Sequence, residues 1–152
     1  MIRARKLLFV LTDGGRAHFV EYHSATSSFA RLAQMDQLHQ IAQARVKQRG
    51  KESGRSHDSD GPGRHLVGSS DHVRTVKKDF MAQVAAQTQL VANQGGFSAA
   101  VIAAPARLIG ELKRQLAGKI EIADAIGKDL TKEPEHDLAK WFKSALFEVA
   151  PE

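Results

Sequence analysis

Cysteine is absent from this sequence of 152 residues. Its absence excludes disulfide bonds and thiolate ligands for metals, and it suits a reducing compartment such as the cytoplasm. Long apolar runs are missing too, because no stretch approaches the roughly 20 apolar residues that a membrane span needs. The run Leu7 to Leu11 is shorter than the apolar part of a secretion signal, and Asp13 follows it closely. We therefore expect a cytoplasmic protein without membrane insertion.

The residues that are present suffice for one folded domain. Hydrophobic residues make up 42% of the chain, which is enough for a core, and the length is typical of a single domain. We therefore expect one domain over residues 1–152. The sequence does not indicate the oligomeric state.

The formal net charge of +5 is concentrated in one part of the chain. Residues 44–78 contain nine Lys or Arg and four Asp or Glu, whereas the remainder holds thirteen of each sign. Localised positive charge attracts polyanions such as nucleic acids, although a solubilising segment would have the same composition. Charge alone therefore leaves an RNA partner and a solvated loop equally open.

Apolar patterning predicts an α/β fold that begins with three antiparallel strands over 6–12, 16–23 and 28–35. Residues 36–46 fit either a helix or a strand. After a long loop we expect a helix ending near 93–96, a buried strand over 97–104 and a helix from Pro105. A strand over 119–126 and a last helix from Thr131, with Trp141 on its apolar side, complete the predicted elements. This order implies a three-layer mixed sheet, with an antiparallel N-terminal meander followed by helix-strand-helix-strand-helix. It is compatible with a ribonuclease H-like layout.

The segment from Gln48 to His72 differs in kind from the rest of the chain. It is rich in Gly and Ser, and such a composition cannot bury enough apolar surface to offset the entropy lost on ordering. We predict a flexible basic loop, followed by a helix capped by Ser69, Ser70 or Asp71. The loop has no aromatic residue, so nucleic acid would be held by its backbone rather than by base stacking. The candidate nucleic-acid-binding residues are Arg45, Lys47, Arg49, Lys51, Arg55, Arg64, His65, Arg74, Lys77 and Lys78. The alternative is an unstructured, solvated insertion.

Histidine and aspartate cluster in the same loop, but the pattern does not predict a metal site. The cluster comprises His57, Asp58, Asp60, His65, Asp71 and His72. No pair has the four-residue spacing of a helical metal site, and a flexible loop does not hold ligands in a fixed geometry. An enzyme that uses these histidines with a metal or a small molecule is therefore the last-ranked alternative, and we expect no metal and no cofactor.

Two polar features near predicted strand ends have both a functional and a structural interpretation. Asp13 could bind metal, as a first-strand carboxylate does in nucleases of the ribonuclease H fold, but the strand at 98–104 supplies no further carboxylate. We interpret Asp13 as a turn residue and expect no nuclease activity. Lys128 and Asp129 could form a charged site at a strand end, whereas Thr131 is expected to cap the last helix.

Several stretches of the sequence carry a family resemblance. The chain opens with KLLFVLTDGGRAHFVEY, has GPGRH and KKDF in its centre, and continues with VIAAPARLIGELKRQL and GKDLTKEP. Together these stretches resemble the bacterial host-attachment protein family, described as bacterial relatives of the archaeo-eukaryotic peptide-chain release factors and of Pelota, over about Lys6 to Phe142. The resemblance implies the ribonuclease H-like fold of the release-factor middle domain. It also implies two roles that differ, namely action at the ribosome on peptidyl-tRNA and attachment of the bacterium to host cells.

The resemblance places the loop at 48–72 where release factors carry a catalytic Gly-Gly-Gln, but no Gly-Gly-Gln occurs in this sequence. Gln94-Gly95-Gly96 has the reverse order and is interpreted as a helix end. The function expected from the resemblance is binding of RNA or the ribosome (tRNA) through the basic loop. Hydrolysis of peptidyl-tRNA stays open, with Gln48 as the candidate catalytic residue. The alternative is a non-catalytic protein, required for attachment to host cells, that binds a protein partner.

Overall fold

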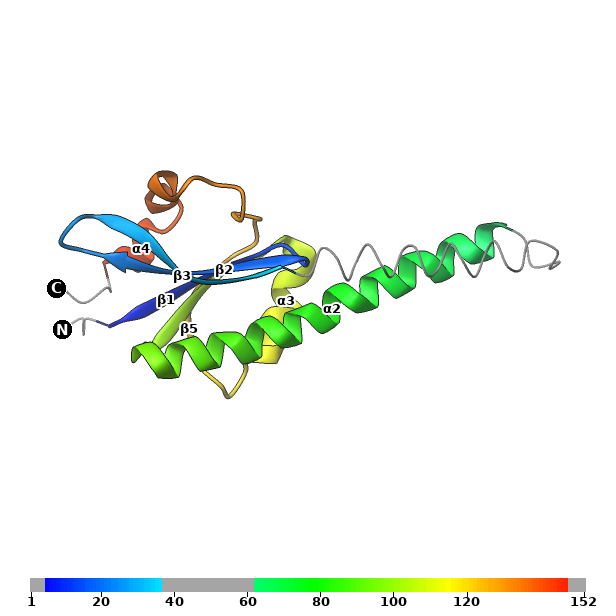
Figure 1. Ribbon diagram of the computed structural model, residues 1–152, viewed down its shortest axis with the longest axis horizontal. Coiled ribbons are helices and arrows are strands. Elements are labelled where there is room, and N and C mark those ends of the chain that lie inside the picture. Colours follow the sequence, from blue (N-terminus) through cyan, green and yellow to red (C-terminus); the bar gives the residue numbers. More distant parts are fainter. Residues whose placement is uncertain (1–4, 37–61, 148–152) are drawn as a thin grey trace.

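The computed structural model describes residues 5–36 and 62–147, and within the longest helix it describes side chains from residue 75 onward. The strands in these ranges are β1 (Leu7–Thr12), β2 (Arg16–His23), β3 (Ser28–Asp36), β4 (Ala99–Ala103) and β5 (Glu121–Ile126). The helices are α2 (Pro62–Gly95), α3 (Ala106–Leu116), the 3₁₀ helix η1 (Glu135–Lys140) and α4 (Lys143–Leu146) (Figure 1). The described strands form one mixed sheet in the order β3-β2-β1-β4-β5. The predicted α/β class and antiparallel meander are confirmed.

Strands β1 and β4 lie inside the sheet because their side chains are apolar on both faces. All residues of both strands are buried. β1 pairs antiparallel with β2, where Phe9 lies opposite Val20, and parallel with β4, where Phe9 lies opposite Val101. β4 in turn pairs parallel with β5. Strands that are apolar on both faces need a covering layer on each.

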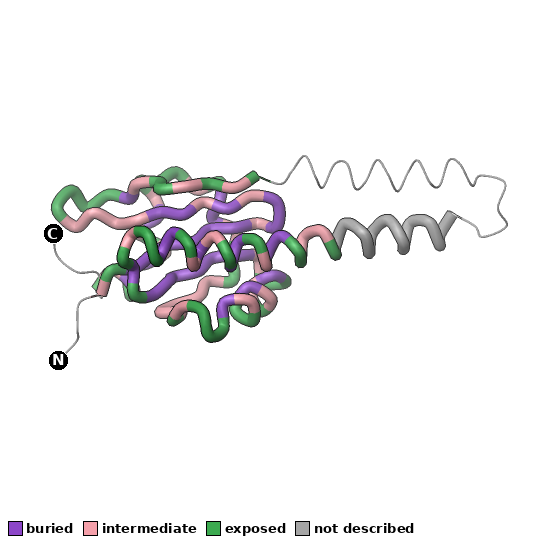
Figure 2. The backbone as a smooth tube through the Cα atoms, turned by 60° about the horizontal axis from the view of Figure 1, so that its bottom comes forward, coloured by how far each residue is buried: buried purple, intermediate pink, exposed green. Residues whose placement is uncertain are grey.

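Helices cover the two faces of the sheet and complete three layers. On one face, Leu8 and Val10 of β1 belong to a core with the inner residues of α2 and α3. On the other face, Phe9 belongs to a second core with residues of η1 and α4, and its ring centroid lies 5.0 Å from that of Phe142. Figure 2 shows buried residues recurring along the inner side of α2, with exposed residues between them. The periodicity of the sequence therefore sets which side of each helix meets the sheet.

Helix α2 begins at Pro62, earlier than the sequence predicted. The expected loop over 48–72 is therefore wrong for residues 62–72, whose backbone is helical, and the predicted capping residues lie inside the helix. Proline is favoured in the first turn of a helix. Extending a helix that is already anchored costs less than nucleating one, and α2 is anchored farther along by buried residues such as Phe80 and Val84. Residues 48–61 lie outside the described part of the chain.

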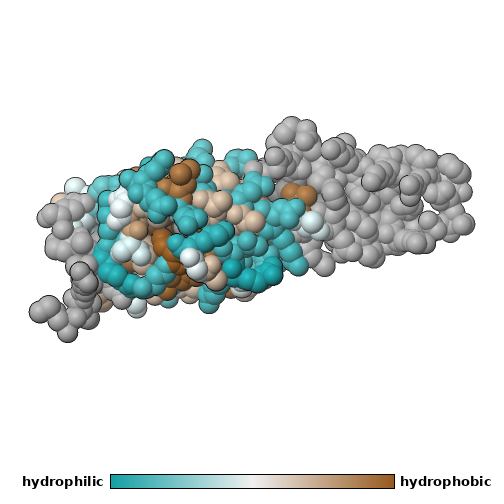
Figure 3. Space-filling model, turned by 90° about the horizontal axis from the view of Figure 1, so that it is seen from below, coloured by the Kyte–Doolittle hydropathy of each residue, from teal (hydrophilic) through white to brown (hydrophobic). Residues whose placement is uncertain are grey.

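The outer side of α2 is polar. Figure 3, which views the molecule from the side of α2 and α3, shows a mostly hydrophilic surface with small, separated hydrophobic patches. Among the described residues, no helix combines the length and the apolar character needed to cross a bilayer.

The single last helix expected from Thr131 is also wrong. The chain instead forms η1 and α4, and the residue before η1 is Pro134, which makes no side-chain cap. Thr131 does not cap a helix because its hydroxyl donates to Asp129 Oδ1 at 2.6 Å and its backbone N–H donates to the same oxygen at 2.9 Å. Proline has no backbone N–H, so a Thr131 cap could not accept a hydrogen bond from Pro134 at the third helical position.

Candidate nucleic-acid interface

The carboxyl ends of the parallel strands meet at one edge of the sheet. β1, β4 and β5 run in the same direction, so the segments 12–15, 104–107 and 127–131 all follow strand ends at this edge. In α/β proteins, ligands bind outside the carboxyl ends of parallel strands. We call these three segments, together with Lys77 and Lys78 of α2, the carboxyl edge.

Helix α2 runs past the carboxyl edge and continues beyond it. Its last residue, Gly95, accepts a hydrogen bond from Lys6 at the start of β1, so α2 runs antiparallel to β1. Figure 1 shows the N-terminal part of α2 projecting beyond the sheet on the side where β1 ends. Gly14 (φ +96°) permits a close approach here, because a Cβ on it would lie 2.9 Å from Leu108 Cδ1 and 3.6 Å from Lys77 Cγ. The stem of Lys77 therefore rests on the turn after β1.

Asp13 organises the turn between β1 and β2. Its Oδ1 accepts hydrogen bonds from the backbone N–H groups of Gly15 at 2.9 Å and Arg16 at 2.8 Å. The hydroxyl of Thr12 donates to the carbonyl of Arg16 at 2.8 Å and closes the same turn. An aspartate that accepts from the residues two and three positions later is a common turn arrangement. The interpretation of Asp13 as a turn residue is confirmed.

The structure adds a neighbour to Asp13 that the sequence did not predict. Asp13 Oδ2 lies 3.5 Å from the hydroxyl of Thr131, which is itself bonded to Asp129. Two carboxylates, from the ends of β1 and β5, thus flank one hydroxyl. Among the described residues, no group of three or more His, Cys, Asp or Glu is placed to hold a metal ion. The signal that could have found this pair is the parallel order of β1, β4 and β5, which brings strand ends distant in sequence to one edge.

His18 lies on β2 in a cluster of charged groups next to the carboxyl edge. Its pKa is lowered from 6.5, first by burial and then by the positive charges of Arg31 and Arg16, while Asp13 and Glu135 oppose the shift. Arg31 also forms an ion pair with Glu135 of η1 at 3.9 Å. The imidazole is therefore neutral at pH 7, where it can accept one hydrogen bond and donate another.

Cations from three elements lie at the carboxyl edge. Lys78, Arg107 and Lys128 are exposed, and Lys77 is half-buried against Gly14. The ammonium group of Lys128 lies 3.9 Å from the ring centroid of Trp141, which holds that charge at a fixed place. Sequence reasoning missed Arg107, because a lone arginine after a strand carries no motif.

The predicted nucleic-acid-binding residues divide into three groups. Those outside the described residues are Arg45, Lys47, Arg49, Lys51 and Arg55, together with the candidate catalytic residue Gln48. Those on the backbone of α2, at positions whose side chains are not described, are Arg64, His65 and Arg74. Lys77 and Lys78 reach the carboxyl edge. Of the predicted His/Asp cluster, His57, Asp58 and Asp60 lie outside the described residues, and Asp71 and His72 lie on α2.

The chain matches the model of a known protein family over most of its length. The model of bacterial archaeo-eukaryotic release factor family 12 matches residues 6–141. No curated protein matches the chain.

Proposed function

We propose, from the premise that the chain belongs to bacterial archaeo-eukaryotic release factor family 12, that this release-factor-like protein binds RNA of the translation machinery at its carboxyl edge. The RNA is tRNA, free or on the ribosome. Segment 44–78, which includes Lys77 and Lys78 and carries the whole excess of positive charge, takes part in the same contact. The family match supports the release-factor-like role, and the charges support the surface.

The observation that carries this proposal is the arrangement of cations around the end of β1. Lys77, Lys78, Arg107 and Lys128 come from two helices and a loop, yet they lie at the edge where α2 leaves the sheet. Lysine and arginine side chains gathered at one edge of a sheet attract phosphate groups. The described part of the carboxyl edge offers no aromatic platform other than Trp141, whose face is occupied by Lys128. Contacts to the RNA backbone therefore fit this surface better than base stacking.

The sheet order supports a finer assignment of the fold. An antiparallel meander β1-β2-β3, continued by β4 and β5 parallel to β1, agrees with a ribonuclease H-like sheet as in the release-factor middle domain. We include this layout, and a cytoplasmic location where translation takes place, in the proposal.

Hydrolysis of peptidyl-tRNA is the reaction that the family suggests. In this chain water would be the nucleophile, and a backbone amide or Gln48 of the 48–72 segment would orient it. The sequence has no Gly-Gly-Gln, so binding is proposed independently of catalysis. The alternative role in attachment to host cells stays a prediction, and no described residue favours it over RNA binding.

Binding of tRNA and of purified ribosomes tests the proposal. The edge variant Lys78→Glu/Arg107→Glu is compared with Lys113→Glu/Lys119→Glu, which makes the same charge change on exposed residues of α3 and its following turn. We expect the edge variant to bind tRNA at least roughly tenfold more weakly, because phosphate contacts become repulsive. The control variant should bind like the unaltered protein. Equal affinities of the two variants would contradict the proposal, and incubation with peptidyl-tRNA then decides separately whether hydrolysis occurs.

A further inference from the structure

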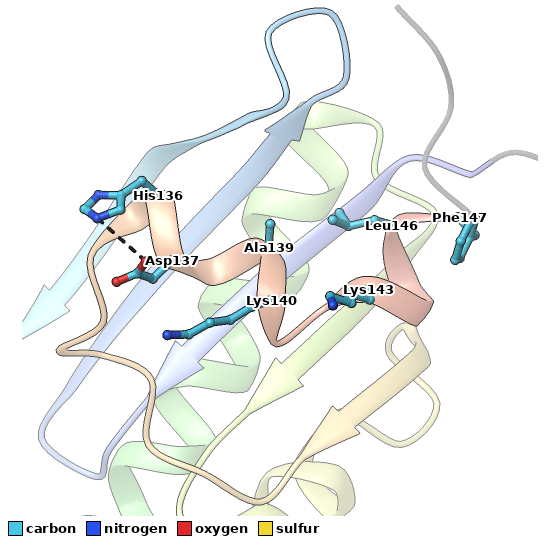
Figure 4. A pocket seen from close by; sticks show the side chains of 7 residues that line it. All are labelled: His136, Asp137, Ala139, Lys140, Lys143, Leu146 and Phe147. Atoms are coloured by element: carbon cyan, nitrogen blue, oxygen red, sulfur yellow. Dashed lines mark ion pairs between the residues drawn. The ribbon is translucent and has the colours of Figure 1, made fainter.

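A second surface lies along η1 and α4, on the face of the sheet opposite to α2 and α3. A cavity of about 570 Å³ is lined by His136, Asp137, Ala139, Lys140, Lys143, Leu146 and Phe147. Figure 4 shows these side chains arranged in sequence order, from His136 and Asp137 at one end to Leu146 and Phe147 at the other. The volume is in the range of sites that accept a ligand or a few side chains of a partner.

One end of this groove is apolar and open to solvent. Phe147 is 84% exposed, the largest exposed fraction among the described large hydrophobic residues. Leu146 beside it is half-buried and packs against the core beneath α4. An exposed aromatic residue at the end of an apolar cavity is unfavourable for an isolated protein, and such places often mark interaction sites.

The charges along the groove indicate which charge its partner carries. Lys140 and Lys143 are exposed and lie between the apolar end and Asp137. Asp137 lies 3.7 Å from His136 Nε2, so its carboxylate already has a nearby partner when that histidine is protonated. The two lysines form salt bridges with no described residue, and their charges are complementary to carboxylates of a partner.

We propose that the groove of η1 and α4 binds a short acidic segment of another protein, which inserts one apolar side chain beside Leu146 and Phe147 and places carboxylates against Lys140 and Lys143. A bound segment would bury Phe147 and pair both lysines. This site lies on the other face of the sheet from α2, and it adjoins the carboxyl edge at Trp141, whose ring centroid is 3.9 Å from Lys128 Nζ and 5.9 Å from Lys140 Nζ.

Two other occupants fit the groove less well. A second copy of this chain in a two-fold symmetric contact would bring Lys140 and Lys143 of both copies together, and like charges repel. RNA would meet Lys140 and Lys143, but it would also meet the carboxylate of Asp137 and only one aromatic ring, whereas single-stranded nucleic acid is usually held by several aromatic platforms in a cationic groove.

Selection from a phage-displayed library of random peptides of about twelve residues tests this proposal on the full chain. We expect enriched peptides to combine Asp or Glu with one Leu, Ile, Met or Phe. A labelled synthetic copy of the most enriched peptide should bind the variants Lys140→Glu/Lys143→Glu and Phe147→Ala at least roughly tenfold more weakly than the unaltered chain. Because all three residues are exposed, the thermal midpoint of each variant should stay near that of the unaltered protein.

The variant Lys113→Glu/Lys119→Glu is the matched control and should bind the peptide with unchanged affinity. Failure to enrich any acidic peptide, or equal binding by the Lys140→Glu/Lys143→Glu variant, would overturn the proposal. The proposal would also be overturned if this variant lost binding to tRNA or to phosphatidylglycerol vesicles while it still bound the peptide. Peptide binding does not bear on the carboxyl edge, whose variants carry their own control, whereas loss of tRNA binding by Lys140→Glu/Lys143→Glu would extend the RNA surface to this groove.

Discussion

His18 couples the stability of the protein to pH. Because its folded pKa lies below the 6.5 of an unfolded chain, the unfolded state binds a proton first as the pH falls. The contribution of a neutral His18 to the free energy of unfolding is therefore complete well above pH 6.5 and is lost progressively as the pH drops below it. Burial is the main cause of the shift, and Arg31 and Arg16 add to it.

Replacing His18 with glutamine should remove this part of the pH dependence. We expect the free energy of unfolding of His18→Gln to fall less than that of the unaltered protein between about pH 7.5 and pH 5. Urea denaturation at a series of pH values measures the difference. A curve for the variant that runs parallel to that of the unaltered protein would show that protonation of His18 is not coupled to folding.

At the level of single residues, the sequence predicted the structural role of Asp13 but not the hydrogen-bond partners of Thr131. Asp13 was identified as a turn residue from its glycine neighbours and from the lack of a carboxylate on the strand at 98–104, and its hydrogen bonds confirm this. Thr131 was assigned to a helix cap, yet it bonds to Asp129 and approaches Asp13, 118 residues away in sequence. Contacts between residues so far apart in the sequence depend on the order of the strands in the sheet, and local sequence patterns do not reveal that order.

Within helices, the spacing of apolar residues correctly indicated which side chains are buried wherever the helix packs along its whole length. Leu108, Leu112 and Leu116 of α3 are buried as their spacing predicts. On α2 the same apolar spacing fits the buried Phe80 and Val84, but it does not predict that Thr88 is buried too. Its hydroxyl donates to the carbonyl of Val84 at 2.7 Å, and this bond allows a polar residue in the core.

The start of α2 and the last helix could not be predicted for a common reason. Gly and Ser in 62–72 favour a loop locally, but a helix anchored at Phe80 extends through them. In the last segment the anchor is Phe142, whose ring packs on Phe9, and the short η1 and α4 bring it there. Tertiary packing therefore overrides local preference at both places.

Two glycines offer a matched test of how the elements fit together. Gly14→Ala should destabilise the protein by about 1–3 kcal/mol, because φ is +96° and the new Cβ would lie 2.9 Å from Leu108 Cδ1. Gly110→Ala, in the middle of α3 with no atom within 4 Å of a Cβ, should instead stabilise it by about 0.5–1 kcal/mol. Chemical denaturation of both variants measures the two changes. Stabilisation by Gly14→Ala would contradict the close packing of α2 and α3 on this turn.

For the whole molecule, one proposed surface lies at the carboxyl edge of the sheet and the other lies on the face that η1 and α4 cover. Both core layers are apolar. Charged side chains lie at the carboxyl edge and along the groove of η1 and α4. The sequence located the basic segment 44–78 but could not show where its residues lie in the fold. The structure places Lys77, near the end of this segment, against Gly14 in the turn after β1.

The salt dependence of tRNA binding tests the central claim most directly. The full chain is compared with a variant in which Arg49, Lys51, Arg55 and Arg64 are alanine, and with a control in which Lys113, Arg114, Lys119 and Lys132 are alanine. We expect weaker binding by the first variant and a slope of log K against log salt that is shallower by up to about 3.5, since each of the four lost phosphate contacts removes about 0.7–0.9. The control should keep the slope of the unaltered protein. Identical slopes for all three proteins, or no tRNA binding by the unaltered chain, would contradict the account.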